Sequence, residues 1–168
     1  MTTRLPAPSA RKPAREASGS PKAAPATARP ARGSAVRELE FAKLDASTQI
    51  QVIRDGMDPA IVGRMATDLL GIPVQTLFTS IRWAPSTINR KIATGERLSP
   101  GESDRVARIL IVHSQAADVL EDAKLASQWM LHPNALLGGE RPLDMLDTQA
   151  GYDRVRDILM RFEYGVGV

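Results

Sequence analysis

The chain has 168 residues, enough for one ordinary domain or two small ones, and contains no cysteine and only two histidines. The absence of cysteine excludes a disulfide framework, a thiolate metal site and a cysteine nucleophile. His113 and His132 alone do not make a histidine-rich metal site. No apolar run is long enough to span a membrane, and no secretory signal follows the first residue, so we expect a cytoplasmic protein.

Charge divides the chain into two unequal parts. Residues 1–37 hold eight of the 22 Lys and Arg residues and one of the 19 Asp and Glu residues, a net charge of +7, and the remainder has a net charge of −4. Residues 1–35 also contain six of the twelve prolines and no aromatic residue, Val or Ile. Such a segment buries too little apolar surface to offset its chain entropy, which predicts disorder.

Three interpretations of this basic tail stay open. It is a solvated extension with no specific role, a basic arm attracted to DNA phosphates, or an organelle transit peptide. The repeated prolines count against the transit peptide, because they interrupt the amphipathic helix that such a peptide forms.

From residue 36 onward the spacing of apolar residues predicts helices throughout and no sheet. Two short groups of apolar residues, one beginning at Val36 and one at Ile50, precede Gly56, where a helix is expected to end. Asp58-Pro59 then predicts the start of a further helix, and Gly71 stands where a left-handed cap belongs. The apolar positions of these segments are Val36, Leu39, Phe41 and Leu44, then Ile50, Val52 and Ile53, then Ile61, Val62, Met65, Leu69 and Leu70.

Residues 73–82 and a segment opening at Pro85 predict two short helices joined by Trp83-Ala84, the second ending near Gly95. Two short helices with a tight turn and a polar, basic second helix are typical of a helix-turn-helix, whose second helix enters the major groove of DNA. We expect Ile88 and Ile92 to anchor that helix to the core.

The polar residues of this pair are candidate contacts to base edges and phosphates. An ordinary solvated helix pair explains the same pattern, and the net negative charge of the body counts against DNA binding, whereas the local cluster of Lys and Arg favours it. The candidate DNA-binding residues are Arg82, Ser86, Thr87, Asn89, Arg90, Lys91 and Arg97.

A long helix is predicted after Ser99-Pro100-Gly101-Glu102, which has the residues of a capping box. His113 lies on its apolar stripe, and we interpret it as a packed core histidine. Asp122 is expected to cap the next helix, and His132 to close it before Pro133.

Residues 129–148 predict a compact loop followed by short helices. Gly138-Gly139 is interpreted as a structural turn, because no strand precedes it and the lysine of a phosphate loop is missing. Pro142 opens a short helix, and Thr148 caps a final helix. The apolar face of that helix is Val155, Ile158, Leu159 and Phe162.

This C-terminal stretch resembles the toxin-binding domain of the Xre/MbcA/ParS antitoxins, which are the partners of RES-domain toxins. Leu98-Ser99-Pro100 also resembles the linker that leaves the Xre-like helix-turn-helix of that family, so the resemblance covers residues 57–168. The motifs that carry it are Pro133-Asn134, Leu137-Gly138-Gly139, Arg141-Pro142-Leu143, Leu146-Asp147-Thr148, Gly151 and Arg161-Phe162-Glu163-Tyr164-Gly165-Val166.

The resemblance implies an all-α antitoxin without enzymatic activity or cofactor. It implies an Xre-like helix-turn-helix domain (36–121) and a toxin-binding domain (122–168). Nothing of the resemblance carries over to the disordered basic tail (1–35), which the composition alone predicts. The resemblance also implies that the chain occludes the active site of an NAD⁺-degrading RES toxin and represses its own operon. The toxin-binding residues carried over by position are Gly138, Gly139, Arg141, Asp147, Arg161, Glu163, Tyr164, Gly165 and Val166.

The terminal residues suit the occlusion of a dinucleotide site. Tyr164 can stack where a ring binds, Glu163 can pair with residues that hold phosphates, and Arg161 can pair with a toxin carboxylate. The alternative is that Phe162 packs in the core and that Arg161 and Glu163 form a solvated pair. The chain departs from the family at Gly167-Val168, where an aromatic residue often stands.

A rival function is a helix-turn-helix repressor whose C-terminal domain only dimerises. Both functions predict operator DNA as a partner and a homodimer, because operator half-sites are usually read by two-fold dimers. An enzyme with a small-molecule substrate is disfavoured, because the sequence shows no catalytic triad spacing, metal cluster or phosphate loop.

Overall fold

The computed structural model describes residues 1–2 and 40–165. Its described part is all-helical and contains no strand among residues 40–165, as the spacing of apolar residues predicts. Residues 3–39, which hold the rest of the basic tail and the start of the predicted first domain at residue 36, lie outside the described residues.

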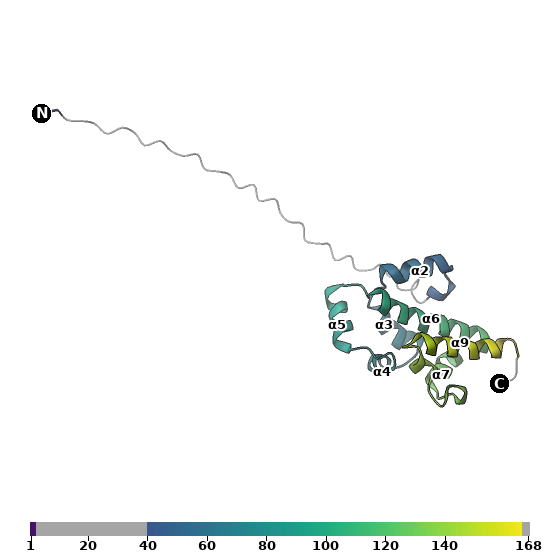
Figure 1. The fold of residues 1–168 in the computed structure, drawn as a ribbon. Helices are drawn as coiled ribbons and strands as arrows, with labels where there is room; N and C mark the ends of the chain where they lie inside the picture. The colour runs from purple at the N-terminus through teal and green to yellow at the C-terminus, as the bar shows by residue number, and fades with distance from the viewer. Residues whose placement is uncertain (3–39, 166–168) are drawn as a thin grey trace.

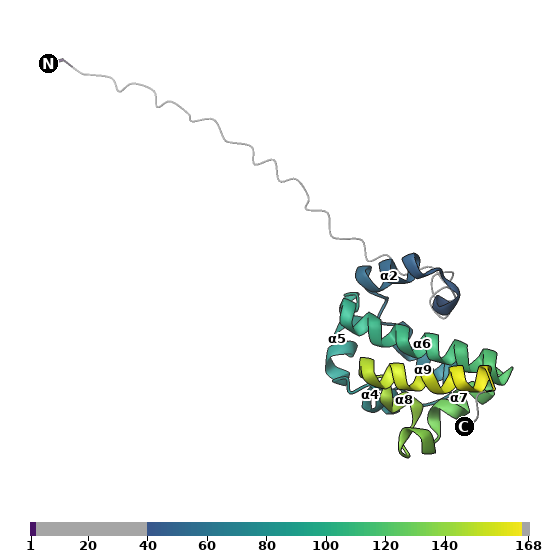
Figure 2. The same ribbon diagram turned by 45° about the vertical axis from the view of Figure 1, so that its right-hand side comes forward.

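The long helix α6 (Pro100–Leu120) is the element around which the others pack. The 3-10 turn η1 (Phe41–Lys43) and α2 (Ala46–Asp55) lie along one side of it. Helices α7 (Ala123–Leu131) and α9 (Gln149–Glu163) lie along the other, and α9 runs beside α6 in both views (Figures 1 and 2).

Shorter elements fill the two ends of the molecule. Helix α3 (Ile61–Arg64) continues into a π-helical turn, η2 (Met65–Leu69), in which the Leu70 N–H donates to the Met65 carbonyl at 3.0 Å. Helices α4 (Val74–Ser80) and α5 (Pro85–Thr94) lie at one end. The 3-10 turn η3 (Ala135–Leu137) and α8 (Pro142–Met145) connect α7 to α9.

Three predicted helix starts are confirmed, and the one at Asp58-Pro59 is wrong. Ser99 and Glu102 form the complete capping box of α6, Asp122 accepts from the first backbone N–H groups of α7, and the Thr148 hydroxyl accepts from the Gly151 N–H. These side chains satisfy helix N–H groups that have no partner within their own helix. The helix after Asp58 begins at Ile61, two residues later than Pro59 suggests.

One apolar cluster runs through the described part without interruption. It joins Phe78 of α4 and Val106 of α6 to Met130 of α7 and Leu143 of α8. The expected domain boundary at 121/122 falls in the short turn between α6 and α7, and side chains from both sides of that boundary share this core. The two expected domains therefore share one hydrophobic core.

Two apolar predictions are wrong. Ile92 is 46% exposed, because it lies on the flank of α5 while the stem of Lys91 occupies the inward position beside the buried Ile88. Phe162 is 42% exposed, because it lies in the last turn of α9, beyond the buried Leu159.

Candidate functional site

The helix pair α4 and α5 is held in place by the side chains between and beneath its helices. Leu77, Phe78 and Ile81 are buried beneath α4, and Ile88 is buried beneath α5. In the connecting turn Arg82 has a φ of 53°, a left-handed conformation that costs a residue with a Cβ about 1 kcal/mol. The Trp83 N–H then donates to the Phe78 carbonyl at 2.9 Å.

The outward face of α5 carries most of the predicted DNA contacts. Ser86, Thr87, Asn89 and Arg90 are all exposed. The Arg90 guanidinium donates to Glu96 at 2.6 Å, and this hydrogen bond lowers the pKa of the Glu96 carboxyl. The exposed hydroxyl, amide and guanidinium groups can bond base edges, and Glu96 competes with DNA for Arg90.

Lys91, in contrast, faces inward. Its side chain is 8% exposed, and its Nζ lies 2.8 Å from the Glu102 carboxylate and 3.5 Å from Glu96. The hydrogen bond to Glu102 raises the pKa of Lys91. Arg97 is exposed, and its guanidinium donates to the Gly56 carbonyl. Lys91 therefore links α5 to the capping box of α6. Its buried side chain does not belong to the outward face of α5, so we do not propose it as a DNA contact.

Two residues predicted to contact the toxin also have partners in the α4–α5 helix pair. The Arg141 guanidinium binds both oxygens of Asp144, at 2.6 and 2.8 Å, and donates to the Ser80 hydroxyl at the end of α4 at 3.3 Å. Asp147, at the junction of α8 and α9, forms an ion pair with Arg82, whose Nε lies 3.0 Å from an oxygen of the carboxylate. A predicted DNA contact and a predicted toxin contact thus form one ion pair.

The Gly138-Gly139 turn lies away from these bridges and is exposed. Its φ values of 72° and 87° are left-handed, which favours glycine at both positions. The Gly139 N–H donates to the Asn134 carbonyl at 2.9 Å, and the Asn134 N–H donates to the Glu140 carbonyl at 3.0 Å. This closed loop agrees with the interpretation of a structural turn.

The end of α9 is the most exposed part of the C-terminal segment. Arg161, Glu163 and Gly165 are exposed, and Tyr164 is 69% exposed. Val166 lies outside the described residues. Beside this end is a surface hollow of about 290 Å³ lined by Gln115, Asp118 and Val119 of α6 and Leu159, Met160 and Glu163 of α9.

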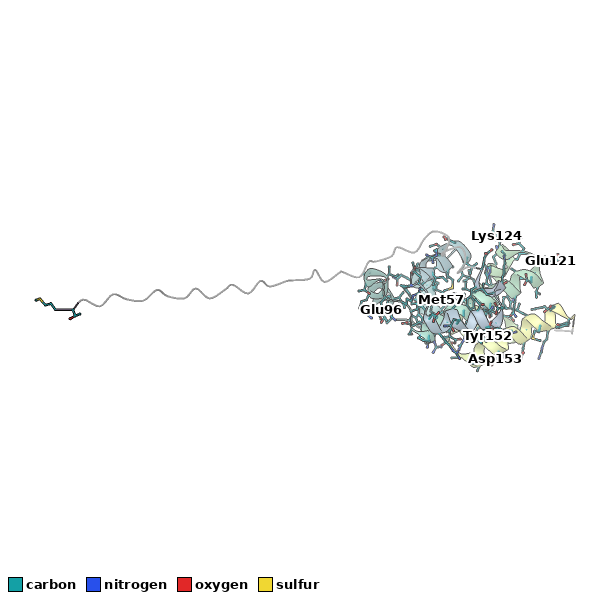
Figure 3. The ribbon with its side chains drawn as sticks, turned by 90° about the horizontal axis from the view of Figure 1, so that it is seen from above. Met57, Glu96, Glu121, Lys124, Tyr152 and Asp153 are labelled. Carbon is teal, nitrogen blue, oxygen red and sulfur yellow. The ribbon has the colours of Figure 1, made fainter. Side chains whose placement is uncertain are left out.

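Sequence reasoning missed the α6 wall of this hollow. Asp118 and Val119 are separated by about 40 residues from the α9 side chains that they face, and no local motif links the two segments. The exposed end of α9 and the α5 helix lie at opposite ends of the described part (Figures 1 and 2). Figure 3 likewise shows Glu96, just after α5, far from Glu121, where α6 ends.

The two histidines have structural partners. His113 is buried, its Nε2 lies 2.9 Å from the Ser127 hydroxyl, and burial lowers its pKa. The interpretation of His113 as a core histidine is confirmed. His132 is the C-cap of α7 and bonds the Gln128 carbonyl at 2.7 Å. Among the described residues no group of three or more His, Asp or Glu side chains could hold a metal ion.

No helix within residues 40–165 has the length and apolar character needed to cross a membrane.

Comparison with known proteins identifies the C-terminal part. Residues 115–165 match the model of the antitoxin Xre/MbcA/ParS C-terminal toxin-binding domain. This part of the chain is a domain of the Xre/MbcA/ParS antitoxin family. The match begins within α6 and ends with the exposed end of α9, so both walls of the hollow belong to the family domain.

Curated proteins similar to this chain are named as antitoxins. The Prs ADP-ribosylating antitoxin of Sphingobium sp. is 27% identical over 70% of this chain and 79% of its own length. Antitoxin Xre of Pseudomonas putida is 30% identical over 49% of this chain, and antitoxin Xre of Yersinia enterocolitica is 35% identical over 48%. The matches span about half the length of these two Xre proteins.

Proposed function

We propose that this antitoxin binds and neutralises a RES-domain NAD⁺-degrading toxin by occluding its active site, and that it represses its own operon by binding DNA. The observation that carries the first part is the exposed end of α9, which completes a domain of the toxin-binding family. The protein acts by binding in the cytoplasm, where NAD⁺ and DNA are both present, and needs no cofactor.

We assign toxin contact to those predicted toxin-binding residues whose side chains or backbone are exposed to solvent. Tyr164 offers an exposed ring for stacking, while Arg161 and Glu163 offer one charge of each sign for pairing with the toxin. The full exposed set is Gly138, Gly139, Arg161, Glu163, Tyr164 and Gly165. Arg141 and Asp147 have the different role of holding α8 and the start of α9 against the helix pair.

DNA contact is assigned to the outward face of α5. Ser86, Thr87 and Asn89 suit base edges, and Arg90 suits a base or a phosphate. Arg82 and Arg97 flank this face and suit phosphates. A homodimer would present two such faces to the half-sites of an operator.

Co-expression with the product of the adjacent gene tests the toxin proposal. If that product alone stops growth and depletes NAD⁺, this chain should restore both, and a variant lacking Glu163–Val168 should not. Asn89→Ala with Arg90→Ala is the matched control, because it changes the DNA-facing surface and should leave neutralisation intact. Full neutralisation by the truncated chain would refute occlusion by the terminal peptide.

The rival function, a repressor whose C-terminal domain only dimerises, is favoured by one observation. Met160 and Phe162 are exposed apolar side chains at the end of α9, as expected of a surface that another chain covers. Size-exclusion chromatography with light scattering separates the two functions. Under the rival, Met160→Ser with Phe162→Ser converts a dimer to a monomer, because it removes the apolar surface that the second chain covers. Under our proposal, this double change leaves the oligomeric state as it was, and the Glu163–Val168 deletion changes neutralisation.

A further inference from the structure

The turn of the helix-turn-helix pair carries a cation whose partner belongs to the C-terminal domain. The side chain of Arg82 is 78% exposed, and its Nε lies 3.0 Å from an oxygen of Asp147. The side chain of Asp147 is only 13% exposed, so its position is fixed by the packing of α8 against α9. We propose that Asp147 is a positioning residue that competes with DNA phosphate for Arg82 and so weakens DNA binding.

The chemistry supports a direct competition. Carboxylate and phosphate oxygens are both matched to a guanidinium, so Arg82 bonded to Asp147 is neutralised as a phosphate contact. Arg82 lies in the turn that precedes α5, beside the residues assigned to base edges. This inference rests on the proposed DNA binding.

A second bridge makes the competition dependent on the C-terminal domain. Arg141, fixed by both oxygens of Asp144, donates to Ser80, two residues before Arg82, and so holds α8 against the end of α4. A partner of the C-terminal domain that shifts α8, or that pairs with Asp147, frees Arg82 for phosphate. By linkage, such a partner and DNA strengthen each other's binding.

Salt dependence of DNA binding measures the proposal. The probe is a fluorescent duplex of the region upstream of the gene for this chain, titrated with full-length protein from 50 to 300 mM salt. Removal of the competing charge in Asp147→Asn should add one phosphate contact, which steepens the slope of log K against log salt by about 0.9. The affinity at fixed salt should rise about two- to fivefold, the size of an exposed ion pair.

Four further proteins isolate the mechanism: Asp157→Asn, Arg82→Gln, Arg82→Gln with Asp147→Asn, and Asp147→Ser. Asp157→Asn makes the same change of net charge on the exposed side of α9, and its slope should equal that of the wild type. In an Arg82→Gln background, Asp147→Asn should leave the slope unchanged. Asp147→Ser also removes the carboxylate, so the test does not depend on the folding of a single variant. Thermal unfolding shows whether each variant is folded.

Each outcome decides between the alternatives. A steeper slope for the Asp147 variants, seen only when Arg82 is present, supports the proposal. Equal slopes for Asp147→Asn and the wild type, an equal change in Asp157→Asn, or an effect that persists in Arg82→Gln overturns it. A wild-type protein that does not bind the duplex refutes the proposed DNA binding itself.

Discussion

Gly151 is the position where one added methyl group should do most damage to the C-terminal domain. It lies in the first turn of α9 and is buried against the end of α8. A Cβ built on Gly151 would lie 1.9 Å from the Met145 carbonyl oxygen and 2.8 Å from its carbonyl carbon. The obstacle is backbone, which cannot rotate away as a side chain can, so Gly151→Ala must push α9 and α8 apart.

Two opposing terms set the size of the effect. Ordinary contact between a Cβ and its neighbours begins near 3.4 Å, so the helices must separate by more than 1 Å. Overpacking of this kind costs about 1–3 kcal/mol, and more where backbone has to move. The higher helix propensity of alanine returns at most about 1 kcal/mol. We therefore expect a loss of about 2 kcal/mol, a large share of the typical stability of a small domain.

Urea unfolding followed by circular dichroism measures this loss, and Gly63→Ala is the matched control. Gly63 is also helical, but a Cβ there meets nothing within 4 Å, so that variant should be stabilised by up to about 1 kcal/mol. If the two variants are equally stable, the close approach of α9 to Met145 does not exist in solution and the reasoning fails.

Two further predictions follow from buried polar groups. Lys91→Ala should lower the free energy of unfolding by about 1–3 kcal/mol in urea, because it leaves Glu102 without its cation, yet it should keep the wild-type salt slope of DNA binding. A flatter slope of log K against log salt in this variant would instead indicate that Lys91 contacts a DNA phosphate. His113, whose pKa is lowered by burial, binds its proton less readily in the folded state than in the unfolded state. The wild type should therefore lose stability as the pH falls below about 6.5, the ordinary histidine value, and His113→Gln should not. Unfolding free energies compared at pH 7.5 and pH 5 test this, and parallel losses in both proteins would contradict it.

The features that sequence reasoning predicted well are those set by near neighbours in the chain. Ser99 finds Glu102 three residues away, and Thr148 finds the Gly151 N–H at the same spacing, so a motif is enough to define each helix start. The inward positions of Ile88 and Leu159 follow from helical periodicity in the same way. Periodicity does not say how wide the buried face is, which is why Ile92 and Phe162 were misplaced.

The roles of polar residues needed the tertiary structure. Arg82, Lys91, Arg141 and Asp147 all have residue types suited to a charged partner, and sequence alone assigned each to an outside partner. The structure gives each a partner inside the chain, and Arg141 bonds Ser80 across 61 positions. Net charge or motif cannot distinguish an internal ion pair from a free cation, because the difference lies in which surfaces the core brings together.

The shared core and the two polar bridges bear on how this antitoxin can be dissected. The family match begins at residue 115, in the last third of α6, yet α6 packs both with α2 and with α7 and α9. A cut at that point would expose the apolar faces of both parts and remove the partners of Arg82 and Ser80. Point variants on opposite surfaces, such as Arg90→Ala on α5 and the Glu163–Val168 deletion on α9, keep the core intact. They are therefore the changes by which the proposed DNA binding and the proposed neutralisation can be separated, and the Arg82–Asp147 pair is the place where we expect the two to be linked.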